Sequence, residues 1–248
     1  MSTPSRLPSP AEVRQRLDAF RARRGYLLPH QGAMAAALPD LQDVYGVVYK
    51  TLTLDPHHLD AFEREFVWLG LLVAAREHVG THHVDLFFRT GGNDAQADTV
   101  FRLVAWAQGH TAYEFLAESW QAYFPASPAG SSYIAGLTDL LRSNPDVEPG
   151  LARLTLAACH AALGHHWPLR VVLRDCYAHG VAEAKIAEAL SLVLWPCGIN
   201  RFLEACDVWL DLMRSGEVQP SPAFQAWADT PDQDGFKLPP RTTVAGTP

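Results

Sequence analysis

The chain has 248 residues, of which 48% are hydrophobic, and carries a formal net charge of −7 at pH 7. This length and apolar content allow a full-sized core, while the acidic balance and scattered arginines leave no sustained basic stripe, so nucleic acid is not expected as a partner. The start lacks the apolar core of a secretory signal, and the longest apolar run is too short to span a bilayer, so we expect a cytoplasmic protein with no membrane partner.

The first predicted helix begins after Ser9 and stops at Gly25. Ser9 is a typical N-cap, Pro10 suits the first helical position, and Glu12 occupies the capping-box position. Two interpretations apply to the arginines near its end: an acidic partner, or a solvated helix end where cations suit the helix dipole. The second interpretation is favoured for these residues, which are Arg21, Arg23 and Arg24.

From Leu38 onward the chain is a succession of helical patterns. Apolar residues recur at helical spacing, and no alternating run with a hairpin turn occurs, so the predicted fold class is all-α. The predicted helices are one that follows Asp55-Pro56 and carries apolar residues at 62, 66, 69, 72 and 73, then residues 81–89, 93–108, 151–163, 168–178 and 182–194, and a last one that ends at Arg214.

Tryptophans and glycines in the middle of the chain recur at a constant distance. The spacing is 89 residues in four pairs: Trp106 and Trp195, Trp120 and Trp209, Gly91 and Gly180, and Gly109 and Gly198. Such a spacing indicates that a helical unit is repeated in tandem. We therefore predict a tandem duplicated fold, in which polar residues that differ between the copies become informative about function.

Turn-forming residues divide the chain into four predicted regions. A stretch rich in proline, serine and glycine, residues 124–132, forms the predicted linker between the copies. Beyond Gly216 the prolines predict an extended arm, either disordered or wrapped over a neighbouring subunit. The predicted regions are an N-terminal helical extension at 1–37, a first repeat at 38–123, a second repeat at 131–215 and a Pro-rich tail at 216–248.

The cysteines lie in the C-terminal half and form no CxxC pair; they are Cys159, Cys176, Cys197 and Cys206. Reduced, buried thiols are the favoured interpretation. Cys176 and His179 form a CxxH pair, but no second pair matches it, so support for a structural zinc site is weak.

Ordered motifs surround the turns of both copies. In the first copy, Arg64-Glu65-Phe66-Val67 precedes an apolar helix, a short turn, His82-His83-Val84-Asp85-Leu86 and Gly91. In the second copy the order is Ala161-Ala162-Leu163-Gly164, Pro168-Leu169-Arg170 and Gly180-Val181. This order resembles the carboxymuconolactone decarboxylase and alkyl hydroperoxidase D superfamily over roughly Leu38 to Arg214. The resemblance implies an all-α, alkyl hydroperoxidase D-like domain in each copy.

The resemblance also assigns a relay pair. The peroxidase branch uses a glutamate, a CxxC pair and a histidine as a proton relay to a thiol. Here the segment where the cysteines would fall, residues 76–80, contains none, so thiol peroxidase chemistry is not expected. Glu65 matches the relay glutamate and His83 the histidine, with His82 as the adjacent alternative. Arg153 and Val172 stand at these positions in the second copy, so we predict one relay site per chain.

A glutamate and a histidine that project from two packed helices can share a proton. The imidazole can take a proton from carbon or return one to an enolate while the carboxylate orients it, and this chemistry needs no cofactor and no metal. The alternative is structural: Glu65 would pair with an arginine such as Arg64 or Arg89, and both histidines would be ordinary hydrogen-bonded residues.

Further histidines leave a metal site open as an alternative. Those near the first turn could join those near the second to bind a divalent ion, although their spacing alone does not show this. Histidines that line a polar pocket or the surface are favoured. The residues concerned are Glu77, His78, His82, His83, His160, His165 and His166.

Three residues are predicted to contact substrate. Arg170 and Arg174 lie one helical turn apart and offer guanidinium groups to a carboxylate, although surface ion pairs are the more common role. Trp68 is expected in the core or the pocket wall, as are Trp106, Trp195 and Tyr113.

The predicted function is a cofactor-independent, carboxymuconolactone decarboxylase-like lyase, or more broadly a proton-transfer enzyme of decarboxylase, isomerase or hydrolase type. Its substrate would be a small carboxylated or lactone metabolite, with Glu65, His83 and His82 as catalytic residues. The alternatives are a non-catalytic small-molecule binding or scaffold protein and a metalloenzyme that uses the histidine cluster. Family members assemble from single copies as trimers or hexamers, so a duplicated chain is expected to form a homo-oligomer, with a trimer favoured.

Overall fold

The computed structural model describes residues 6–235, and no strand occurs among them. The predicted all-α class is therefore confirmed. Within the same residues, no helix combines the length and apolar character needed to cross a membrane.

The chain divides into two compact units between Ala61 and Phe62. The predicted boundary after residue 37 does not coincide with this division, and the predicted first repeat, residues 38–123, spans it. The packing explains the difference. Helix α3 (Pro39–Tyr49) packs on α2 (Pro29–Ala37), and α2 packs on α1 (Pro10–Arg24), which ties the start of the predicted repeat to the N-terminal helices.

The first unit consists of three helices and one π-helical turn: α1 (Pro10–Arg24), α2 (Pro29–Ala37), α3 (Pro39–Tyr49) and η1 (Lys50–Leu54). The predicted capping box of α1 is present, since the Glu12 N–H donates to Ser9 Oγ at 3.3 Å and the Ser9 N–H donates to Glu12 Oε2 at 2.6 Å. Helix α2 lies where the sequence patterns predict none. It carries the buried residues Met34 and Ala35.

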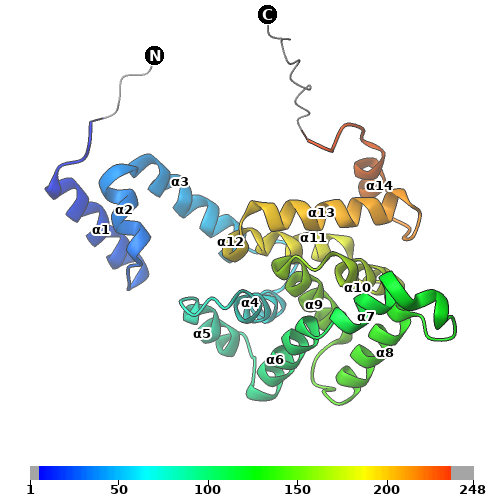
Figure 1. Ribbon diagram of the computed structural model, residues 1–248. Coiled ribbons are helices and arrows are strands. Elements are labelled where there is room, and N and C mark those ends of the chain that lie inside the picture. The colour runs from blue at the N-terminus through cyan, green and yellow to red at the C-terminus, as the bar shows by residue number, and fades with distance from the viewer. Residues whose placement is uncertain (1–5, 236–248) are drawn as a thin grey trace, which may run out of the picture. The chain divides into compact units, whose positions relative to one another are not determined.

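The second unit contains the remaining helices (Figure 1). They are α4 (Ala61–Ala75), α5 (Thr81–Arg89), α6 (Asp94–Gln108), α7 (Thr111–Phe115), η2 (Leu116–Trp120), η3 (Gln121–Tyr123), α8 (Ala129–Arg142), α9 (Pro149–Leu163), α10 (His166–Ala178), α11 (Glu183–Leu192), α12 (Leu194–Cys197), α13 (Ile199–Arg214) and α14 (Pro222–Asp229). The helices predicted in this part of the chain are all present. Helix α8 begins inside the predicted linker, which shortens the connection.

The predicted extended arm is wrong for residues 222–229, which form α14. Phe224 and Trp227 of this helix pack on Trp209 of α13, with ring centroids 5.1 and 5.4 Å apart. Arg214 also donates hydrogen bonds to the carbonyls of Ala228 and Thr230. Packing of two partly buried aromatic rings one turn apart thus outweighs the proline-rich composition. The last part of the predicted tail, residues 236–248, lies outside the described residues.

Helix α9 is the central helix of the second unit, packed against α6, α10, α11 and α13 (Figure 1). Every residue from 151 to 162 is buried. Helix α4 approaches it at Gly70, where a Cβ atom would lie only 2.6 Å from Thr155 Cγ2 and 3.3 Å from Cys159 Sγ. A glycine at this position therefore allows two helices to pack at close range.

Helices α4 and α9 end in the same way. Each is followed by a residue in the left-handed region, Arg76 with φ 56° and Gly164 with φ 72°. The N–H of the next residue, Glu77 or His165, then bonds to a carbonyl five residues back, at 2.8 and 2.9 Å. This is the Schellman arrangement, which satisfies carbonyl groups at a helix end. The two ends lie 88 residues apart.

Helices α5 and α10 share a second such ending. Gly91 and Gly180 have φ angles of 101° and 68°, and the N–H groups of Gly92 and Val181 bond to carbonyls five residues back. These ends lie 89 residues apart. The segment between the two helix ends is therefore one residue shorter in α4–α5 than in α9–α10.

Candidate functional site

The predicted relay residues come together between α4 and α5. Glu65 lies on α4 and His83 in the first turn of α5, and their side chains are 2% and 3% exposed. Nδ1 of His83 is 2.7 Å from Oε2 of Glu65. A contact of this length is a strong hydrogen bond with a carboxylate acceptor.

The donor and acceptor roles follow from the chemistry of the pair. An ionised carboxylate only accepts hydrogen bonds. The hydrogen therefore lies on Nδ1 of His83, which donates the hydrogen bond to Glu65. Among residues 6–235 no other hydrogen bond reaches the His83 ring. This tautomer leaves Nε2 of His83 without a hydrogen-bond partner among the described residues.

Trp68 forms one wall of the pair. It lies one turn after Glu65 on α4 and stacks on His83, with ring centroids 4.5 Å apart and planes 19° apart. Its indole N–H is buried and has no hydrogen-bond acceptor among the described residues. Buried N–H groups normally have an acceptor. The indole N–H of Trp68 is therefore an unused hydrogen-bond donor beside the imidazole.

His82 lies at the edge of the same group. Its ring centroid is 4.2 Å from that of His83, and the residue is only partly buried. His82 is thus the more exposed of two neighbouring imidazoles. The structure brings together four of the six predicted site residues: Glu65, His82, His83 and Trp68.

The two arginines proposed as partners of Glu65 behave differently. Nε of Arg64 is 3.6 Å from Oε1 of Glu65, which is an ion pair but longer than a hydrogen bond. Arg89 pairs instead with Asp85 on its own helix at 2.9 Å. The closest partner of Glu65 is therefore His83 rather than an arginine.

Arg170 and Arg174, the predicted carboxylate-binding residues, make ion pairs elsewhere. Arg170 pairs with Asp211 at 2.5 Å and with Glu217, and Arg174 pairs with Glu217 at 2.9 Å. The hydrogen bond from Arg170 lowers the pKa of Glu217. These guanidinium groups already have carboxylate partners from α13 and the turn after it, and no contact joins them to Glu65 or His83.

Arg153 on α9 and Val172 on α10, the predicted counterparts of Glu65 and His83, do not form a pair with each other. Nε of Arg153 donates to Asp175 Oδ2 at 2.6 Å, and both side chains are buried. Arg153 also donates to the Pro149 carbonyl and to His179. Val172, the predicted counterpart of His83 in the second copy, is fully buried. This arrangement fixes a charged guanidinium in place and offers no imidazole for proton exchange.

A second group of histidines gathers where α7, α9 and α10 meet. His110 and His165 have ring centroids 3.9 Å apart, and Nδ1 of His160 is 3.4 Å from Nδ1 of His165. The Tyr133 hydroxyl on α8 donates to Nε2 of His160 at 2.8 Å, and Nε2 of His110 is 3.0 Å from Glu114. His110 and Tyr133 are absent from the predicted cluster, because no local pattern connects residues that distant helices bring together.

Burial and mutual repulsion govern the charge of this histidine cluster. Burial, and then the neighbouring His165 and His110, hold the pKa of His160 well below its usual range. Burial, followed by His110 and Arg201, lowers the pKa of His165 to about 4. Both rings are therefore expected to be neutral at pH 7.

The structure does not gather the histidines of the two turns into one site. His160 and His165 contact His110, whereas Glu77 accepts a hydrogen bond from the Val79 N–H beside α5. Within residues 6–235, no group of three or more His, Cys, Asp or Glu side chains is arranged to hold a metal ion. All four cysteines are free thiols, and burial raises the pKa of Cys159 and Cys176 to about 12.

Two cavities have linings that do not include the Glu65–His83 pair. One, of about 310 Å³, is lined by the ends of α9, α10 and α11 and includes Arg153, His179 and Lys185. The other, of about 670 Å³, belongs to the first unit. Neither cavity is lined by Glu65 or His83.

Comparison with known proteins adds no relative: no family model, no curated protein and no solved structure matches the chain.

Proposed function

We propose that the chain is a cofactor-independent proton-transfer enzyme of the carboxymuconolactone decarboxylase type, with the Glu65–His83 pair as its catalytic centre. The observation that carries the proposal is the 2.7 Å hydrogen bond between two buried ionisable groups from different helices. A carboxylate and an imidazole held in hydrogen-bond contact by two helices have the arrangement that general acid–base catalysis uses.

The proposed chemistry uses Nε2 of His83. Decarboxylation or isomerisation of a carbonyl-containing acid passes through an enolate, which must be protonated on carbon. Protonated His83 would supply that proton from Nε2, and Glu65 would stabilise the imidazolium through the hydrogen bond to Nδ1. The indole N–H of Trp68 would donate to the developing oxyanion, and His82 would exchange protons between His83 and solvent.

We further propose that the chain is a tandem duplication in which only the first copy keeps the relay. Two features support this part of the proposal: the Schellman endings that recur after 88 and 89 residues, and the matching order of α4–α6 and α9–α11. Arg153 and Val172 occupy the corresponding positions in the second copy.

An exposed aromatic surface supports the proposed homo-oligomer. Phe115 and Trp120 pack edge to face with ring centroids 4.9 Å apart, and Phe124 lies 6.4 Å from Trp120. All three are about half exposed, and Tyr123 is 77% exposed. A contiguous aromatic patch of this kind is typical of an interaction surface. Sedimentation equilibrium would test the expected trimer, and a monomer at micromolar concentration would contradict it.

The proposed function is tested by a substrate screen with matched variants. Carboxylactones, β-keto acids and intermediates of aromatic catabolism would be incubated with the protein in D₂O, with CO₂ release and deuterium incorporation measured. Glu65→Gln and His83→Asn should each reduce turnover at least 100-fold, because general acid–base catalysis contributes about 10²–10⁴-fold. Glu63→Gln, on the same helix but paired with Lys185, and His78→Asn, on the exposed turn, are the controls.

The burial of the pair favours one alternative, a non-catalytic scaffold protein in which Glu65 and His83 only tie α4 to α5. In that case the folded Glu65→Gln and His83→Asn proteins would leave any turnover unchanged while unfolding at lower urea concentration. Retained activity in both variants, with a wild-type pH profile, would therefore refute the catalytic role and support the structural one.

A further inference from the structure

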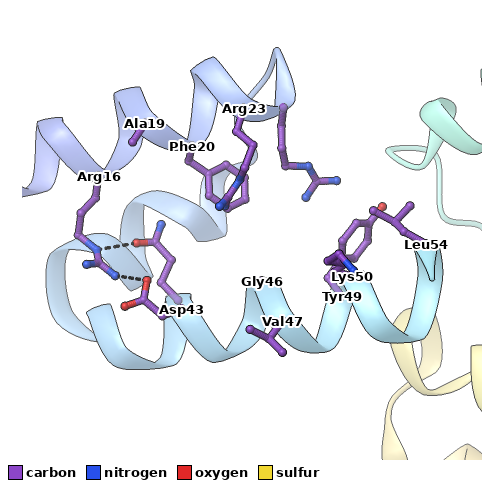
Figure 2. Close-up of a pocket in the computed structure, with 12 residues that line it drawn as sticks. Arg16, Ala19, Phe20, Arg23, Asp43, Gly46, Val47, Tyr49, Lys50 and Leu54 are labelled. Atoms are coloured by element: carbon purple, nitrogen blue, oxygen red, sulfur yellow. Dashed lines mark hydrogen bonds and ion pairs between the residues drawn. The ribbon is translucent and has the colours of Figure 1, made fainter.

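The first unit contains a cleft between α1 and α3 that the proposed function does not use (Figure 2). Its volume is about 670 Å³, which lies within the range of small-molecule sites. All of its lining residues belong to α1, α3 and η1. The cleft is therefore complete within one unit.

Arginines of α1 bridge the cleft at both ends. Arg16 donates to Gln42 at 3.0 Å and to Asp43 at 2.5 Å, both on α3. Eight residues further along α1, the guanidinium of Arg24 lies 4.4 Å from the ring centroid of Tyr49. Eight residues of helix span about 12 Å, so the two bridges hold the helices apart over the length of a small organic molecule.

The space between the bridges has an apolar floor. Phe20 of α1 is buried and faces the cleft, and Val47 and Leu54 line it from the other side. Gly46 lies in the middle of α3, and a Cβ atom built there would meet nothing within 4 Å. Figure 2 shows Gly46 on the helix opposite Phe20, at the open centre of the cleft.

The charges of the cleft do not balance. Arg16 is paired with Asp43, and Lys50 with Asp55. Arg23 and Arg24 have no carboxylate partner within the described part of the chain. Arg24 hydrogen-bonds the Tyr26 hydroxyl, and Arg23 lies over the Phe20 ring at 5.2 Å. The positive charges of these two guanidinium groups, which lie beside aromatic rings, are therefore not neutralised by a carboxylate of the described residues.

The favoured interpretation of the arginine run as a solvated helix end accounts for only part of it. Arg21 is 60% exposed and pairs with Asp18 at 3.4 Å, as expected for such an end. Arg23, which is also exposed, and the partly buried Arg24 line the cleft. The dipole of α1 favours cations at this end, but it does not explain why two of them border an apolar cavity.

We propose that this cleft is a binding site for an aromatic carboxylate, independent of the Glu65–His83 centre. The ring system would lie against Phe20 and Val47, and the carboxylate would accept hydrogen bonds from Arg23 and Arg24. Guanidinium groups suit such a ligand because they pair with carboxylates in a fork and stack on aromatic faces.

Isothermal titration of the full chain with 2-naphthoate tests the proposal. We expect one molecule bound per chain, with affinity about tenfold weaker for neutral 2-naphthamide and for the Arg23→Gln variant. Inorganic phosphate, which has the charge but no ring, should also bind at least tenfold more weakly. These ratios separate recognition of an aromatic anion from general attraction of anions.

A pair of glycine variants tests the location. Gly46→Leu should fill the cleft and abolish binding, while Gly32→Leu on α2 should change the affinity less than twofold. The comparison is matched because a Cβ atom at either glycine meets nothing within 4 Å, and neither has a left-handed φ. Circular dichroism would verify the fold of both variants. Equal affinity of the two variants, or no binding to the folded wild-type protein, would overturn the proposal.

Discussion

Lowering the pH from 7 to 5 is expected to destabilise the second unit through His160 and His165. Both rings have a lowered pKa in the folded chain, whereas an unfolded histidine titrates near 6.5. The unfolded state therefore binds more protons below pH 6.5, and stability falls as the pH drops toward 5. The charged and titratable groups around these rings are His110, Tyr133, His166 and Arg201, and Glu114 contacts His110.

The size of the effect follows from proton linkage. The buried His160 ring stays neutral at pH 5, whereas the same histidine in the unfolded chain is protonated. At 1.36 kcal/mol per pH unit below 6.5, this difference lowers the free energy of unfolding by about 2 kcal/mol. His165 is partly exposed, so solvent screening reduces its share to about 1 kcal/mol. A total of about 3 kcal/mol is a large part of the 5–15 kcal/mol typical of a folded domain.

Urea unfolding followed by tryptophan fluorescence at pH 7 and pH 5 measures this effect. The wild-type protein should lose about 3 kcal/mol more than the His160→Gln/His165→Gln variant between the two pH values. Should the double variant be too unstable to study, His165→Gln alone should remove about 1 kcal/mol of the pH dependence. His78→Gln, on an exposed turn, is the control. Identical pH dependence in the wild-type and variant proteins would refute the reasoning.

Three further substitutions test packing, backbone strain and a buried ion pair. Gly70→Ala should destabilise by about 1–3 kcal/mol, because its Cβ would meet Thr155 at 2.6 Å; an unchanged urea midpoint would contradict the close contact. Arg76→Gly should stabilise by about 1 kcal/mol in the same assay, since φ is 56° there and the left-handed region penalises a side chain. Arg153→Met should cost about 3–5 kcal/mol by removing the buried guanidinium from Asp175, which then keeps only His179 at 3.3 Å, and pairing it with Asp175→Leu should recover part of that loss.

Local patterns in the sequence were sufficient to predict most helices of the second unit. Apolar spacing located α5 at residues 81–89 and the end of α9 at residue 163, because both signals lie within one element. Helix α2 is short and rich in alanine, which offers no contrast between a polar and an apolar face. Helix α14 lies in a proline-rich stretch, and its stability comes from packing on Trp209, a contact that composition does not contain.

The candidate site was predictable where a motif placed its residues, and not where long-range packing did. The resemblance paired Glu65 with His83, and the structure brings these two side chains into contact. The partner of Arg170 and Arg174 is Glu217, more than forty residues later, and no local rule connects them. The contact of Tyr133 with His160 likewise depends on the packing of α8 beside α9 and α10.

The close approach of α4 to α9 at Gly70 has a consequence for synthesis of the chain. Helix α4 leaves the ribosome about 88 residues before α9, which at 5–20 residues per second is roughly 4 to 18 seconds. During that interval α4, whose Phe66, Val67 and Leu71 are fully buried in the finished protein, lacks the helix that packs against Gly70. The nascent chain thus passes through a period in which a folding chaperone has an apolar helix to bind.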